Sequence, residues 1–111
     1  MAFTVQTPDG QTIGQGGNGK WSHVIIAKAD LGHFQALAAE SANTIAGYVE
    51  RGSWTPEEAA VNKRHWDQRL AAMEAQPWLI YSTHKSEAAA QRTLRQAKDD
   101  DGYTNARIVE L

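Results

Sequence analysis

The sequence predicts a two-layer α+β fold, in which a mixed sheet of about four to five strands carries its helices mainly on one face. Three observations predict this class. Short apolar runs of strand length recur, longer stretches place apolar residues every three or four positions, and turn or capping residues separate the two kinds of segment. The expected order is β-β-β-α-α-β-α-β within a single domain, residues 1–111, with a hairpin and glycine-rich loop over residues 1–20 and the core over residues 21–111.

The first strands are predicted around a turn tripeptide. Pro8-Asp9-Gly10 lies between the runs FTVQT and QTI. This tripeptide favours a turn, because proline presets one dihedral and glycine accepts positive φ, so residues 3–14 should form a hairpin. The run WSHVIIAKA at residues 21–29 contains three consecutive β-branched residues without alternation. Such a run is typical of a central strand that is covered on both faces.

Two helices should follow as a pair. Asp30 can cap the first, which should end near Gly52, and Thr55-Pro56-Glu57-Glu58 is a capping box that starts a second helix reaching about Gln76. The apolar or small stripe of the first helix is expected to be buried and contains Phe34, Leu37, Ala38, Ser41, Ile45, Tyr48 and Val49. The stripe of the second helix contains Ala59, Trp66, Leu70 and Met73.

The C-terminal third predicts strand, helix and strand. Pro77 precedes the strand WLIYST, and Ser86 caps the helix EAAAQRTLRQAK, whose narrow face of Ala90, Leu94 and Ala97 suits packing on a sheet. Three consecutive aspartates oppose the helix dipole, so this helix should stop at or before Lys98. Residues 103–111 supply the last strand.

The connections constrain the topology. A short link at residues 52–54 makes the first two helices antiparallel, so the strand at 78 should run opposite to the strand at 21. One helix joins the strands at 78 and 105, which should therefore pair in parallel through a right-handed crossover. Three helices on one side leave the other face to be covered, and a homodimer is one way to bury it.

Composition excludes several classes of function. The chain has no cysteine, which excludes disulfides, thiolate metal sites and a cysteine nucleophile. The net charge of -2 lacks the basic excess of a duplex nucleic-acid binder. No apolar run approaches a membrane span and the start lacks the features of a signal peptide, so we expect a cytoplasmic protein without membrane contact.

The stretch GQGGNGKW at residues 14–21 partly matches a phosphate-binding loop. Gly14, Gly19 and Lys20 fit the G-x-x-x-x-G-K pattern, but Trp21 occupies the position that needs a hydroxyl, and a strand follows where a helix is required. We therefore interpret the stretch as a loop between two strands. It does not predict a nucleotide hydrolase.

A better-placed anion site lies where the strand at 78 ends and the next helix begins. Free amides at a helix N-terminus favour an anion there. The residues that would form this site are Lys20, Ser82, Thr83, His84, Lys85, Ser86 and Arg92. The alternative is that Ser86 is only a helix cap and the remainder a polar loop.

No catalytic or metal site is predicted. The four histidines show no i, i+4 pair and no H-E-x-x-H motif, and no acid, base and nucleophile can be placed in one site. We accordingly expect no cofactor and no enzymatic activity.

The remaining functional signal is aromatic and acidic. Trp21 and Trp54 flank predicted loops, where exposed tryptophan is typical of protein interfaces, and Asp99, Asp100 and Asp101 form an acidic turn. The small size and the lack of a catalytic signature fit the general character of accessory proteins of mobile elements. The leading prediction is a non-enzymatic protein-binding module, an inhibitor or an assembly component, and the alternative is a protein that senses or sequesters a nucleotide or other small anion.

Overall fold

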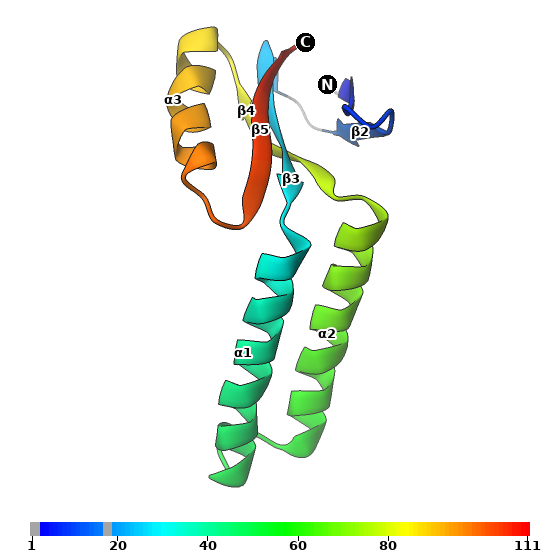
Figure 1. Cartoon of the computed structure of the whole chain (residues 1–111), viewed down its shortest axis with the longest axis vertical. Helices are drawn as coiled ribbons and strands as arrows, with labels where there is room; N and C mark the ends of the chain where they lie inside the picture. Colours follow the sequence, from blue (N-terminus) through cyan, green and yellow to red (C-terminus); the bar gives the residue numbers. More distant parts are fainter. Residues whose placement is uncertain (1–2, 17–18) are drawn as a thin grey trace. The chain divides into compact units, whose positions relative to one another are not determined.

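The computed structural model describes residues 3–16 and 19–111, which contain five strands and three helices in the predicted order (Figure 1). Two compact units are present. One comprises the described residues up to Asp30 together with Pro77–Leu111, and we call it the β-unit. The other comprises Leu31–Gln76, and we call it the helical hairpin. No helix in the described part of the chain combines the length and apolarity that crossing a membrane requires.

The N-terminal hairpin is confirmed. Strands β1 (Phe3–Gln6) and β2 (Thr12–Gln15) pair antiparallel, with Val5 opposite Ile13. Gly10 has a φ of +88°, the conformation for which glycine is suited. The Thr7 hydroxyl donates to Asp9 and accepts the Gln11 amide at 3.1 Å, so local side-chain bonds fix the turn.

A second, three-stranded sheet contains the central strand that the sequence predicts. Strand β3 (His23–Ala29) lies between β4 (Trp78–His84) and β5 (Tyr103–Glu110), and both neighbours run antiparallel to it. The four consecutive side chains Val24–Ala27 are all at most 1% exposed. The expected antiparallel relation of the strands at 21 and 78 is therefore confirmed.

The expectation of one mixed sheet is wrong. β4 and β5 are antiparallel to the same strand and so share a direction, but β3 separates them and no parallel pair forms among the described strands. A single helical connection sets the relative direction of two strands, whereas their adjacency depends on which strand fills the space between them. β1 and β2 form their own two-stranded sheet.

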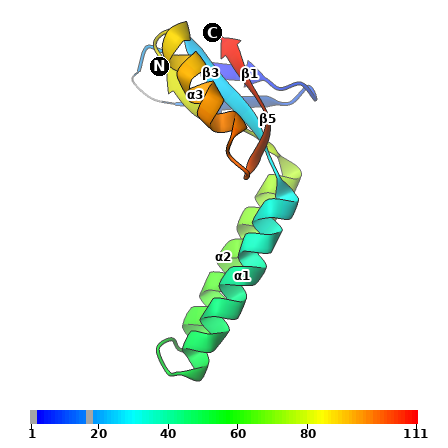
Figure 2. The ribbon, with the colours of Figure 1, turned by 60° about the vertical axis from the view of Figure 1, so that its left-hand side comes forward.

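The sheet of the β-unit is covered on both faces. On one face, residues of the N-terminal hairpin, β3 and β4 form an apolar cluster that contains Val5, Ile13, Val24, Ile26 and Trp78. On the other, α3 (Glu87–Lys98) contacts all three strands, and its Ala90 and Ala97 are fully buried (Figures 1 and 2). The N-terminal hairpin thus covers the face for which the sequence suggested a homodimer as one way of burial.

The predicted helix pair forms within its own unit. Helices α1 (Leu31–Glu50) and α2 (Pro56–Ala75) are antiparallel and contact each other. Gly52, with a φ of +80°, ends the first, and the full Thr55/Glu58 capping box starts the second. Of the three helices, α3 covers a face of the sheet within the β-unit, whereas α1 and α2 pack against each other in a unit of their own.

The helical hairpin buries less than its apolar stripes suggest. Phe34 and Ile45 of α1 are buried, but Leu37 and Tyr48 from the same stripe are each 38% exposed. α2 has no buried residue, and its Trp66 is half-buried. Helical periodicity identifies the apolar face, but two helices alone cannot cover all of it.

Candidate functional site

The residues predicted to bind a partner belong to both units. Trp54 lies in the loop that joins α1 to α2 in the helical hairpin, where its ring stacks on that of Tyr48 with centroids 6.5 Å apart. Trp21 and the aspartates at 99–101 belong to the β-unit. Each unit therefore carries candidate site residues of its own.

The acidic turn has a structural member. Asp100 accepts a hydrogen bond from the Gly102 amide at 3.0 Å and one from the Tyr81 hydroxyl at 3.3 Å. Desolvation, followed by the Asp100 carboxylate, raises the pKa of Tyr81 above its ordinary value of 10.0. The side chains of Asp99 and Asp101 are exposed, and Asp99 is the C-cap residue of α3, where its backbone amide donates to the Gln96 carbonyl at 3.1 Å.

The predicted anion site is partly assembled. Ser82 Oγ and His84 Nε2 lie 2.7 Å apart, and Lys85 Nζ lies 5.7 Å from the Trp21 ring centroid. The Ser86 hydroxyl accepts the Ala89 amide, which confirms its capping role. Of the other predicted members, Thr83 alternates to the opposite face of the sheet from Ser82 and His84, and Lys20 and Arg92 are exposed.

Sequence reasoning missed one member of this region. His23 at the start of β3 is the register partner of both His84 and Glu110, and its Nδ1 lies 2.8 Å from Ser22 Oγ. The signal was present, because an antiparallel pair brings the start of one strand beside the end of the other. Within residues 3–16 and 19–111, no three His, Asp or Glu side chains are grouped in a way that would hold a metal ion.

The glycine motif does not form a phosphate loop in the part that is described. Gly14 lies inside β2, where a Cβ atom would be only 2.9 Å from the Phe3 carbonyl oxygen. This glycine therefore permits close strand pairing. Gly17 and Asn18 of the motif lie outside the described residues.

The helical hairpin carries a groove lined by aromatic side chains, which we call the aromatic groove. Its lining residues are Leu37, Glu40, Ser41, Thr44, Ile45, Tyr48, Trp54, Asn62 and Trp66. Cationic groups lie over two of its rings, with Arg51 5.2 Å from the Tyr48 centroid and Arg69 4.9 Å from that of Trp66. The sequence singled out Trp54 but placed Leu37 and Tyr48 in a buried stripe, so the groove itself was missed.

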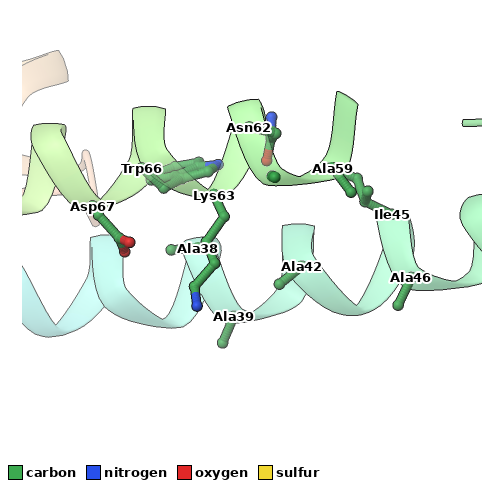
Figure 3. A pocket seen from close by; sticks show the side chains of 11 residues that line it. Ala38, Ala39, Ala42, Ile45, Ala46, Ala59, Asn62, Lys63, Trp66 and Asp67 are labelled. Atoms are coloured by element: carbon green, nitrogen blue, oxygen red, sulfur yellow. The ribbon is translucent and has the colours of Figure 1, made fainter. Parts of the chain in front are cut away.

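A second hollow of about 430 Å³ lies on the same unit, and we call it the alanine groove (Figure 3). Its lining residues are Ala38, Ala39, Ala42, Ile45, Ala46, Ala59, Ala60, Asn62, Lys63, Trp66 and Asp67. Ile45, Asn62 and Trp66 line both grooves. The two grooves therefore lie on either side of the line along which α1 and α2 meet.

Comparison of the chain with protein-family models, with curated proteins and with solved structures finds no match.

Proposed function

We propose that this protein is a small, non-enzymatic binding module that captures an apolar helix of a partner protein in its aromatic groove. One observation carries the proposal: Leu37 and Tyr48 are each 38% exposed beside Trp54 and Trp66. Tyrosine and tryptophan are the residues that dominate binding energy at protein interfaces. An inhibitor or an assembly component of the accessory kind would act in this way.

The shape of the groove favours a helical partner. The groove is lined by α1 residues from Leu37 to Tyr48, by Trp54 and by Asn62 and Trp66 of α2, and an amphipathic helix can place apolar anchors of successive turns against such a surface. Glu40 is the only acidic residue that lines the described groove. Since Arg51 and Arg69 lie over the Tyr48 and Trp66 rings, charges of both signs border the groove, and we expect the apolar anchors of the partner helix to determine binding.

A photo-crosslinking amino acid tests this function in the cell that makes the protein. Placed at Leu37 inside the groove, it should give one dominant crosslinked polypeptide, and Trp54→Ala should weaken that capture by about 30-fold, the loss of a typical hot spot. Ala36 is the matched control, since it is exposed on the same helix and lines neither groove. Equal products from both positions, or capture that ignores Trp54→Ala, would contradict the proposal.

A second candidate function is binding of a nucleotide or other small anion by the β-unit. The observation that favours it is the Lys85 ammonium beside the Trp21 ring, with the Ser82 and His84 pair in the segment that directly precedes Lys85. A tryptophan face can stack on a base while lysine and histidine hold phosphate. Thermal shifts with inorganic phosphate and a nucleotide panel should then be lost in Lys85→Ala. Shifts that are absent, or that persist in the variant, would remove this candidate.

A further inference from the structure

We infer that the alanine groove binds the alanine groove of a second copy of this chain, so that two helical hairpins form an antiparallel four-helix bundle. The inference goes beyond the proposed function, because it concerns the other side of the line where α1 and α2 meet. It rests on three features of the unit: its low burial, its charge-poor wall and its self-complementary charges.

The first feature is low burial. Of the two 20-residue helices, only Phe34 and Ile45 are buried, and α2 contributes no buried side chain. Most helical stability in proteins comes from packing of an apolar face rather than from helix propensity. A pair of helices with so few buried residues gains most from another layer of helices, as in a four-helix bundle.

The second feature is the lack of charge on α1. Among Asp, Glu, Lys and Arg, this helix contains only Glu40 and Glu50, whereas α2 contains seven such residues. Neither glutamate lines the alanine groove, whose α1 wall consists of Ile45 and alanines. A solvated helix face normally carries charged residues, and depletion of charge is typical of the centre of an interface.

The third feature identifies the occupant as a second copy. Lys63 and Asp67 are the only charged residues that line the described groove, and they lie one turn apart on α2. A two-fold axis that crosses α2 between them would bring Lys63 of one copy opposite Asp67 of the other, twice. Figure 3 shows both side chains extending from α2 beside Ala38 and Ala39, so alanines would meet close to that axis.

The face is large enough for a dimer. The lining of the alanine groove runs from Ala38 to Ala46 on α1 and from Ala59 to Asp67 on α2, so a dimer would use the whole faces of both helices and not the groove alone. Two helices about 30 Å long and about 10 Å wide present a face on the order of 600 Å². This projected area is close to the roughly 800 Å² of accessible surface that each partner buries in a specific complex. The alanine side chains also permit close approach of the helices, which increases the number of contacts.

The test measures the mass of the full chain by sedimentation over a range of concentrations. Wild type should be a dimer at micromolar concentration, and Ala42→Glu should weaken dimerisation by at least about 30-fold, because it buries an unpaired charge. Ala36→Glu, which adds the same charge outside both grooves, should leave the dimer intact. Circular dichroism of each variant checks that its helices still form. A monomeric wild type, or a dimer that tolerates Ala42→Glu as well as Ala36→Glu, would overturn the inference.

Charge reversal tests the two-fold arrangement itself. Lys63→Glu makes both charged positions acidic and Asp67→Lys makes both basic, so each variant alone should dimerise more weakly than wild type. Mixing the two should restore a heterodimer, and the double variant Lys63→Glu/Asp67→Lys should again form a homodimer. Equal dimerisation of all four proteins would overturn the proposed pairing. Trp54→Ala leaves this groove intact, so loss of partner capture with the dimer retained separates this inference from the proposed function.

Discussion

Asp100 connects the turn after α3 to the sheet through a single carboxylate. One oxygen accepts from the Gly102 amide and the other from the Tyr81 hydroxyl, while the Tyr81 ring meets Tyr103 edge-on at 5.3 Å. The neighbours Asp99 and Asp101 have the same side chain as Asp100, but they are exposed, whereas Asp100 is half-buried. A run of identical residues therefore divides into one structural acid and two acids that face solvent.

The pKa of Tyr81 provides a test of this cluster. Desolvation and the Asp100 carboxylate favour the neutral phenol, so the pKa lies above its unfolded value of about 10. The stabilisation is fully present below about pH 10 and is lost as the pH rises through the folded pKa. Asp100→Asn should lower the pKa of Tyr81, measured by tyrosinate absorbance with Tyr81→Phe used to assign the signal. Asp99→Asn is the control, and the same titration curve in Asp100→Asn and wild type would contradict the assignment.

The backbone conformation of Asn105 leads to a second prediction, which concerns the unfolding free energy of variants at this position. Its φ of 56° is left-handed, and it lies where β5 shifts register against β3 between Ile26 and Lys28. A left-handed conformation costs a β-branched residue about 1–2 kcal/mol, whereas glycine adopts it freely. In urea denaturation, Asn105→Val should lose about that amount of unfolding free energy and Asn105→Gly much less. The exposed neighbour Thr104 serves as control through Thr104→Ser, which keeps the hydroxyl that donates to the Lys28 carbonyl at 3.4 Å and should change little.

At the scale of the elements, local chemistry predicted most of the boundaries. The Pro8-Asp9-Gly10 turn, the Thr55 capping box and the Ser86 cap are all observed, because each depends on side chains that act within a few residues. The neighbours of each strand were harder to predict. An apolar run indicates that a strand is buried, but it does not say whether β3 or β5 lies beside β4.

The capping box should have a measurable effect on α2. Thr55 Oγ1 accepts the Glu58 amide at 3.1 Å, and the Glu58 carboxylate accepts the Thr55 amide at 3.2 Å. Thr55→Ala should therefore lower the unfolding free energy by about 1 kcal/mol, and Thr55→Ser should retain most of it. Hydrogen exchange of amides in the first turn of α2 would measure the loss. Ser53→Ala is the control, and equal exchange in Thr55→Ala and Ser53→Ala would contradict a capping contribution.

At the scale of the whole molecule, the candidate site residues were predictable only where the residue type and its place beside a predicted loop or helix start were informative. Trp54 and the segment from Ser82 to Ser86 were singled out from sequence, whereas His23 and both grooves were not. His23 meets His84 only through strand pairing. Within the helical hairpin, α2 leaves Leu37 and Tyr48 exposed in the aromatic groove, and periodicity alone does not show how much of an apolar face its neighbour covers.

The two units should differ in stability and in their response to concentration. Val24, Ile25 and Ile26 of β3 are at most 1% exposed, whereas the buried residues of the helical hairpin, Phe34 and Ile45, are each 8% exposed. Amides of β3 should therefore exchange with solvent most slowly, because their opening requires loss of the best-packed core.

If the helical hairpins of two copies associate, protection of the α1 and α2 amides from exchange should rise with protein concentration in wild type but not in Ala42→Glu, by mass action on the dimer. Protection in β3 should stay unchanged over the same range. Hairpin amides that exchange as slowly as those of β3 in dilute Ala42→Glu would show that two helices need no further layer, and would contradict the link between low burial and association.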